Sequence, residues 1–329
     1  MTNTITRRIA GAAVASLALL AVAACGSGSG GDSGSGTSGD DYEIGVVHFS
    51  STDAFAEAVV ASYTKYADTK GWKVSEINPE GSVDKAISAI NNLVSKKVDL
   101  IVTETFPSDQ LTAGIRVAKA AGIPVVSIGG GIVDGVVGAQ DFGKASGEPT
   151  SQQMVKDLGG KGELLQLVNS GALPCKGRRE AFDEALKGTS IKVTRQEVPV
   201  PGQVEAGQQF AQAFVARHPA GAGPLAVWGC WDDPAVGAIN TLKRSNRTDV
   251  KIYGINGSPD ALKAVEAGSM RATTYTDPVE TGEGLGAKTP DFIKGGVDMK
   301  PVTLPVPNFL VTSETLADFN AKYPGVMPK

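Results

Sequence analysis

Short runs of β-branched and other apolar residues alternate with longer stretches that have one apolar face, and this alternation constrains the fold more than any other feature. It runs from Tyr42 to Ile128 and starts again at Glu163. Strict alternation of strands and helices predicts parallel sheets that are covered by helices on both faces. Two rounds of the pattern therefore predict an α/β protein with two doubly wound lobes.

The first 24 residues have the pattern of a signal peptide. Arg7 and Arg8 give the segment a positively charged N-terminal region. The apolar stretch 9–24 that follows is shorter than the roughly 20 residues that cross a bilayer. Val22-Ala23-Ala24-Cys25 resembles the lipobox of bacterial lipoproteins. This resemblance implies cleavage before Cys25 and a diacylglyceryl group on its sulfur. An ordinary secretory signal with an accidental cysteine is the alternative.

Residues 25–41 predict a lipid-attachment cysteine followed by a linker. Gly, Ser, Thr and Asp make up nearly all of 26–41, and such a composition behaves as a flexible coil. No later stretch is apolar over the length that a transmembrane helix needs. We therefore expect a folded body in the cell envelope, outside the cytoplasm, that acyl chains anchor to the membrane.

Charge and cysteine content argue against several classes of protein. The net charge is −4, and acidic and basic residues are interspersed, so no footprint for nucleic acid is present. With only His48 and His218 as histidines, we expect no metal site. Outside the cytoplasm, the pair Cys175 and Cys230 tends to form a disulfide, with two free buried thiols as the alternative.

In an open α/β sheet, a ligand binds beyond the carboxyl ends of the strands, where the strand order reverses. This rule selects the loops 49–55, 103–107, 169–178 and 229–233, which follow the first and third strands of each round. Their carboxylates, donors and aromatic rings suit a polyhydroxylated small molecule. The candidate ligand-binding residues, together with one from a later turn, are Asp53, Phe55, Glu104, Phe106, Arg178, Trp231, Asp232 and Asn256.

Several of these residues have a purely structural alternative. Asp53 and Asp232 could only cap helices. Phe55 and Phe106 could belong to the core, and Arg178 could be a surface charge.

No catalytic motif is present that would indicate an enzyme. The chain has no Gly-x-Ser-x-Gly elbow, no His-Glu-x-x-His motif and no glycine-rich phosphate loop. Asp53 and Glu104 could form the acid–base pair of a glycosidase, but no sequence rule supplies the separation that this needs. We therefore expect neither catalysis nor a cofactor.

Several stretches together resemble the type I periplasmic sugar-binding proteins, in particular the ribose-binding group. The resemblance covers about 44–307 and is clearest at Gly254-Ile255-Asn256-Gly257-Ser258-Pro259-Asp260. Further stretches that carry it lie at 44–47, 53–55, 121–126, 178–182 and 231–238.

The resemblance implies two Rossmann-like lobes joined by three hinge segments, which close on a ligand. It implies an N-terminal lobe at 42–142 plus 277–302 and a C-terminal lobe at 143–276 plus 303–329. It also places Cys175 and Cys230 at the ends of neighbouring strands, so we predict that they form a disulfide.

Carried over position by position, the resemblance assigns Asp53, Phe55, Glu104 and Arg178 to the sugar site and adds Thr276 near a hinge. Two departures stand out. Asn256 replaces the usual aspartate, and Gly129-Gly130-Gly131 replaces the Asp-Arg of ribose binders, which leaves room at Gly130. Trp231 adds an aromatic surface, so we expect a ligand other than ribose bound in the usual way.

The predicted function is that of a solute receptor of an ABC importer, which captures a sugar, a polyol or a related small molecule between its lobes. Its partners would be the ligand, the ABC permease and, through Cys25, the membrane; we expect a monomer. A sensory module that presents the bound state to a membrane receptor or kinase is the alternative.

Overall fold

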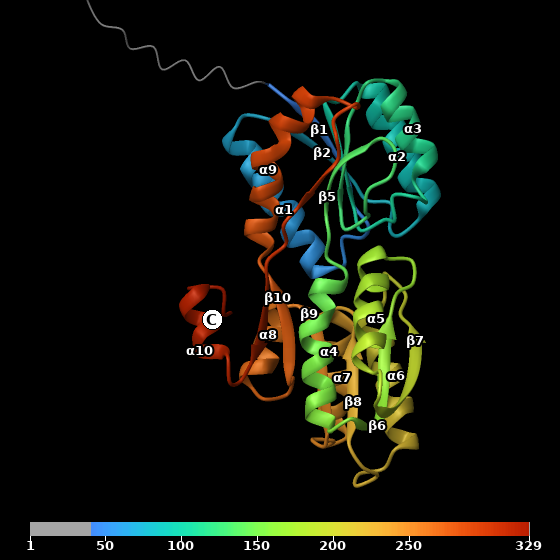
Figure 1. The fold of residues 1–329 in the computed structure, drawn as a ribbon, viewed down its shortest axis with the longest axis vertical. Helices are drawn as coiled ribbons and strands as arrows, with labels where there is room; N and C mark the ends of the chain where they lie inside the picture. Colours follow the sequence, from blue (N-terminus) through green and yellow to red (C-terminus); the bar gives the residue numbers. More distant parts are fainter. Residues whose placement is uncertain (1–40, 329) are drawn as a thin grey trace, which may run out of the picture. The chain divides into compact units, whose positions relative to one another are not determined.

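The computed structural model describes residues 41–328, so Cys25 lies outside the described residues. Within them the chain forms two six-stranded sheets (Figure 1). The first consists of β1 (Glu43–Val47), β2 (Lys73–Ile77), β3 (Leu100–Glu104), β4 (Val125–Ile128), β5 (Val136–Gln140) and β11 (Val302–Leu304). Its order is β11-β5-β4-β3-β1-β2, and all neighbouring strands run parallel.

The second sheet repeats this plan with one change. It consists of β6 (Lys161–Val168), β7 (Ser190–Glu197), β8 (Leu225–Gly229), β9 (Val250–Asn256), β10 (Ala272–Thr276) and β12 (Asn308–Thr312), in the order β12-β10-β9-β8-β6-β7. Only β10 with β12, at one edge of this sheet, is antiparallel. The two sheets confirm the prediction of two doubly wound lobes.

Helices cover both faces of the first sheet. These are α1 (Ala54–Thr69), α2 (Val83–Lys96), α3 (Thr112–Ala120) and α9 (Pro278–Gly295). Neighbouring side chains of β1 point to opposite faces, so Val46 packs in a core with α1 and α9, and Val47 in a core with α2 and α3 (Figure 1).

The second sheet packs on one continuous core. Its helices are α4 (Lys144–Leu158), α5 (Leu173–Ala185), α6 (Gln203–Arg217), α7 (Asp232–Arg244), α8 (Pro259–Glu266) and α10 (Leu316–Lys322). Helix α4 packs against α5, and α6 packs against α7. Among residues 41–328, none of the helices combines the length and the apolar character that crossing a membrane requires.

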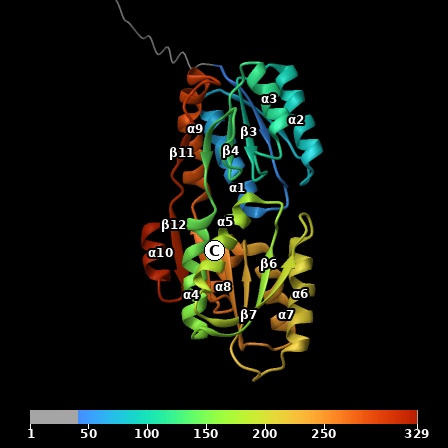
Figure 2. The same cartoon turned by 45° about the vertical axis from the view of Figure 1, so that its right-hand side comes forward.

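The described chain passes between the sheets three times, at 141–143, at 277 and at 305–307. We assign the N-terminal lobe to the first sheet with its helices, and the C-terminal lobe to the second. Figure 2 shows β11 beside strands from the N-terminal half. Because β11 pairs with β5 as far as Leu304, the boundary expected between 302 and 303 falls inside this strand.

Strand β5 and helix α4 were not predicted from the pattern. Gly138 interrupts the apolar run of β5, and α4 follows Gly143 and contains Gly147 and Pro149. Glycine and proline lower helix propensity, so the stretch has no clear helical signal. Tertiary packing therefore determines that β5 and α4 form.

Helices α6 and α7 lie unusually close together because a glycine stands at each point of contact. A Cβ atom on Gly207 would lie 2.8 Å from the Cα of Pro234, and one on Gly237 would lie 3.0 Å from the carbonyl carbon of Val204. The first turns of both helices are therefore held side by side.

Replacing Gly207 by alanine is expected to destabilise the protein by about 1–3 kcal/mol, because the added methyl group forces two packed helices apart. Gly284, in α9, is the matched control, since no atom lies within 4 Å of an added Cβ. Gly284→Ala is expected to stabilise by roughly 0.5–1 kcal/mol, because alanine favours the helix. Thermal unfolding followed by circular dichroism checks both variants, and changes of the same sign in the two would contradict the packing argument.

Candidate ligand-binding site

A cavity lies at the carboxyl ends of the strands, where both lobes contribute to its wall. The N-terminal lobe supplies Phe49, Asp53, Phe55, Ala56, Val59, Glu104, Thr105 and Ile128. The C-terminal lobe supplies Asn169, Ala172, Pro174, Cys175, Arg178, Val200, Trp231 and Asn256, and Phe142 comes from the first crossing segment.

The cavity has room for a few water-sized groups. Its volume is about 50 Å³, measured as the space open to the centres of water molecules. One buried water needs roughly 10–15 Å³ on this measure. Aromatic and aliphatic side chains form most of the wall, with a few polar groups among them, as in other small-molecule sites.

Asp53 has two roles. Its carboxylate accepts a hydrogen bond from the backbone N–H of Ala56 at 2.9 Å, so it caps α1, and it also lines the cavity. Burial raises its pKa, against the opposing effects of the Ala56 N–H and of the positive charge on Arg178. The structural alternative and the ligand-site prediction are therefore compatible for this residue.

Glu104 ends β3 and is fully buried beside the cavity. One carboxyl oxygen accepts from the backbone N–H of Phe49 at 2.9 Å, and the other is hydrogen-bonded to the Thr105 hydroxyl. Burial raises the pKa of Glu104 to about 8, although the Thr105 hydroxyl lowers it. The side chain is therefore mostly the neutral acid at pH 7.

Two cavity residues have a backbone conformation that costs energy. Thr105 has φ of 63° and Asn256 has φ of 113°, although neither is glycine. Such conformations are costly, above all for a β-branched residue, and they concentrate at functional sites. They fix the turns that follow β3 and β9, and with them the shape of the wall.

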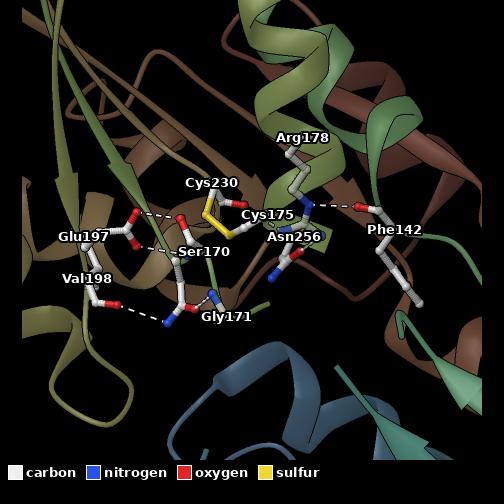
Figure 3. Close-up of a disulfide and its surroundings, with 10 residues drawn as sticks. Phe142, Ser170, Gly171, Cys175, Arg178, Glu197, Val198, Cys230 and Asn256 are labelled. Atoms are coloured by element: carbon white, nitrogen blue, oxygen red, sulfur yellow. Dashed lines mark hydrogen bonds between the residues drawn. A yellow bond between two sulfur atoms is a disulfide. The ribbon is translucent and has the colours of Figure 1, made fainter. Parts of the chain in front are cut away.

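Arg178 joins three separate segments of the chain. Its Nε donates to the carbonyl oxygen of Phe142 at 2.8 Å, its Nη1 to that of Cys230 at 2.7 Å, and its Nη2 to Oδ1 of Asn256 at 2.9 Å (Figure 3). A guanidinium has five N–H groups, so these bonds leave two for a solute. Burial lowers the pKa of Arg178 to about 10, against the effect of nearby carboxylates, so it stays charged at neutral pH.

The position of Arg178 depends on close contact between two helices. A Cβ on Gly147, in α4, would lie 2.7 Å from the Cα of Arg178, in α5. Glycine at this position lets α5 approach the crossing segment, so that Arg178 reaches the carbonyl oxygen of Phe142.

Cys175 and Cys230 form the predicted disulfide, with their Cα atoms 5.5 Å apart (Figure 3). It ties the first turn of α5 to the loop after β8, and α5 is the helix that carries Arg178. The same loop offers the Cys230 carbonyl to Arg178. Covalent and hydrogen-bonded links therefore hold this wall of the cavity together.

Two aromatic side chains face the cavity from different lobes. Phe55 lines it at the start of α1 and packs edge-on against Phe142, with ring centroids 5.6 Å apart. Trp231 lines it from the residue before α7 and is 4% exposed. Its indole nitrogen has no regular hydrogen bond, but the indole lowers the pKa of the nearby Asp233 carboxylate.

Phe106 and Gly130 were expected at the ligand but do not line the cavity. Phe106 is buried in the core and packs edge-on against Phe49, with centroids 4.9 Å apart. Gly130 donates its N–H to the Ser127 hydroxyl at 2.8 Å, and a Cβ on it would overlap the carbonyl oxygen of Phe106. Gly130 therefore closes a tight turn after β4.

Asp232 and Thr276 also lie outside the cavity wall. Asp232 accepts from the Ser258 N–H at 2.7 Å and from the Thr273 hydroxyl at 2.8 Å, so its carboxylate joins the start of α8 to β10. Burial raises its pKa to about 7. Thr276 donates its hydroxyl to Oδ1 of Asn308 at 2.8 Å and so links β10 to β12.

The structure adds cavity residues that the sequence did not single out. Phe142 lies in the crossing segment after the unpredicted strand β5, so no signal marked it. Asn169 stands at the start of a loop that was selected, but only the charged and aromatic side chains were chosen there. Its amide donates to the carbonyl oxygen of Val198 at 3.1 Å, and its oxygen accepts from the Gly171 N–H at 2.9 Å.

Among residues 41–328, no group of three or more His, Cys, Asp and Glu side chains could hold a metal ion. The cavity offers hydrogen-bonding groups and rings, and the arrangement is suited to holding a solute.

Comparison with known proteins agrees with this architecture. The model of the periplasmic binding protein domain matches residues 44–286. The xylitol-binding protein of Mycolicibacterium smegmatis is 28% identical over 270 residues, 80% of this chain and 75% of that protein. The ribose import binding protein of Escherichia coli is 24% identical over 238 residues, 70% of this chain and 78% of its own length.

A solved structure shows the same fold. It is an ABC transporter solute-binding protein from Agrobacterium vitis with bound allitol, with a TM-score of 0.79 at 23% identity, covering 87% of this chain and all of that one. These findings confirm the resemblance found in the sequence and the expectation that the chain is not an enzyme. The chain belongs to the periplasmic binding protein family.

Proposed function

We propose that the chain is the lipid-anchored, extracytoplasmic solute receptor of an ABC importer, and that it captures a sugar or a polyol in the cavity between its lobes. The observation that carries this proposal is the cavity itself, which sets Asp53 of one lobe and Arg178 of the other around one small space. The relatives named for xylitol and ribose support this class of solute.

The chemistry of the wall fits a polyhydroxylated solute. A hydroxyl group both donates and accepts, so it can donate to the Asp53 carboxylate and accept from the free N–H groups of Arg178. Hydrogen bonds to such charged partners are stronger than those between neutral groups. The rings of Phe55 and Trp231 offer apolar surface to the C–H groups of the solute.

The charges around the cavity favour an uncharged solute. Glu104 is mostly neutral at pH 7, and the positive charge of Arg178 interacts with the Asp53 carboxylate. A charged solute would leave one of these groups without its partner in a buried place, which is costly. Sugar acids and sugar phosphates are therefore poor ligands in this proposal.

The segments that connect the lobes support a mechanism in which the lobes close on the solute. The three crossing segments are short, and both lobes contribute to the wall, so a solute that bridges the lobes stabilises their closed arrangement. Closure would give a permease a shape to recognise. The leader, Cys25 and the Gly- and Ser-rich linker would keep the receptor at the membrane surface.

A screen of neutral sugars, polyols and sugar acids by thermal shift tests the proposed ligand class. A binding solute at 100 times its Kd is expected to stabilise the wild type by about 2.7 kcal/mol. Arg178→Ala and Phe55→Ala are expected to lose this shift. Arg179→Ala, which changes the next arginine of the same helix outside the cavity wall, is the matched control and keeps it. A shift that survives in Arg178→Ala would place the solute elsewhere.

Glu104→Gln is expected to change how stability depends on pH. The folded-state pKa of Glu104, about 8, lies above its ordinary value of 4.5, so the folded state binds a proton more readily than the unfolded state. Stability from this group is complete below pH 4.5 and is lost as pH rises toward 8, on the order of a few kcal/mol. The melting temperature should therefore fall between pH 5 and 8 more in the wild type than in the glutamine variant. Parallel curves would contradict the burial of a neutral acid.

Cys25→Ser tests the anchor. Metabolic labelling with an alkyne fatty acid is expected to mark the wild type, which should sediment with membranes, and not the variant. Ser27→Ala, two residues further along, is the matched control and is expected to be labelled. A fatty acid on Cys25→Ser would show that the lipidation site is wrong.

A further inference from the structure

A second set of contacts joins the lobes outside the cavity. Gln203, the first residue of α6, donates its amide to the carbonyl oxygen of Thr52 at 2.6 Å and to Oδ2 of Asp233 at 3.1 Å. The Thr52 hydroxyl also donates to the amide oxygen of Gln203 at 3.4 Å. Thr52 belongs to the N-terminal lobe, Gln203 and Asp233 belong to the C-terminal lobe, and none of the three lines the cavity.

The fold places these groups together. Close packing at Gly207 and Gly237 sets the first turns of α6 and α7 side by side, which brings Gln203 next to Asp233. Gln203 is only 4% exposed, although its amide is polar. Each hydrogen bond that replaces one to water contributes modestly to stability, so the contact of Gln203 with Thr52 favours the arrangement in which the lobes meet.

The Asp233 carboxylate lies at the start of α1, in the other lobe. The backbone N–H of Ala54, the first residue of that helix, lowers the pKa of Asp233, as do Gln203 and the Trp231 indole. Negative charge is stabilised at the start of a helix. The Ala54 N–H therefore offsets part of the cost of burying the Asp233 carboxylate where the lobes meet.

We propose that Thr52, Gln203 and Asp233 form an interlobe latch that stabilises the closed arrangement directly, and thereby sets the affinity for the solute without touching it. The latch opens when the lobes separate. Gln203 then loses its hydrogen bonds to Thr52, and the Asp233 carboxylate loses its interaction with the backbone N–H at the start of α1. Apparent affinity scales with the fraction of molecules in the binding-competent state. Removing the hydrogen bonds that join Gln203 to the carbonyl oxygen and the hydroxyl of Thr52 is expected to reduce the closed-to-open ratio about tenfold.

The charges around Asp233 make the latch sensitive to pH. Burial and, next in size, the negative charge of Asp53 raise the pKa of Asp233 to about 7. Asp232 also faces this group, and Arg178 interacts with both Asp53 and Asp232. In separated lobes Asp233 would lose the nearby Asp53 charge and would be more exposed to water, so its pKa would be lower. The closed arrangement therefore binds a proton more readily, so closure is favoured as pH falls toward 6 and weakened as pH rises toward 8.

Distances between spin labels in the solute-free protein test the latch. Asn92→Cys in α2 and Gln212→Cys in α6 place labels at exposed positions, one in each lobe. A Cys25→Ser background leaves no other free thiol, because Cys175 and Cys230 are paired. At pH 6 the wild type is expected to populate a short distance, which Gln203→Ala depletes about tenfold relative to the long one.

The matched control is Gln208→Ala, on the same helix, because the Gln208 side chain accepts only from Arg244, within its own lobe, among the described contacts. It is expected to leave the distances unchanged. Asp233→Asn keeps an oxygen for the Gln203 amide and removes the titration of this group, so its distances should change less between pH 6 and 8 than those of the wild type, which shifts to the long distance.

Equal distance distributions in the wild type and Gln203→Ala would overturn the proposal. An equal pH response in the wild type and Asp233→Asn would overturn the assignment of the pH response to Asp233. The measurement needs no solute, so either result leaves the proposed solute class untouched.

Discussion

The whole site depends on one buried guanidinium. Arg178 hydrogen-bonds to the crossing segment at Phe142, to the loop after β8 at Cys230 and to the end of β9 at Asn256. Burial of a charge is costly, and it is tolerated here because several hydrogen bonds and nearby carboxylates compensate. Loss of this side chain would leave two buried carbonyl groups without a donor, so the wall would lose its shape as well as its charge.

Around this group, the chain is held in place before any solute arrives. The disulfide between Cys175 and Cys230 fixes the start of α5, and the costly backbone conformations of Thr105 and Asn256 fix two turns of the wall. A wall that is ordered in advance loses less entropy on binding. The C-terminal wall therefore shapes the cavity, whereas the interlobe latch favours contact between the lobes.

The fold class follows from the sequence because hydrophobic periodicity and strand–helix order are local properties. The loops that line the cavity follow as well, since the topology fixes which strand ends meet, and Asp53, Arg178 and Trp231 do line it. The role of each side chain in these loops does not follow from the sequence. Phe106 comes directly after Thr105, whose unusual φ reverses the chain, and its side chain enters the core.

A shift of one residue in a helix turns the side chain by about 100°. The sequence could not show which of the adjacent residues Asp232 and Asp233 faces the other lobe. The structure turns Asp232 into the C-terminal lobe, toward Thr273, and brings Asp233 to Gln203 and the start of α1. Tertiary packing determines which aspartate faces which lobe, here through the close contacts of α6 with α7 at their glycines.

A crystal structure of the protein with a stabilising polyol would test the central claim most directly. The account requires density for one solute between the lobes, with hydroxyl groups within hydrogen-bonding distance of both the Asp53 carboxylate and the Arg178 guanidinium. A solute bound to one lobe alone, or outside the space between Phe55 and Trp231, would contradict it.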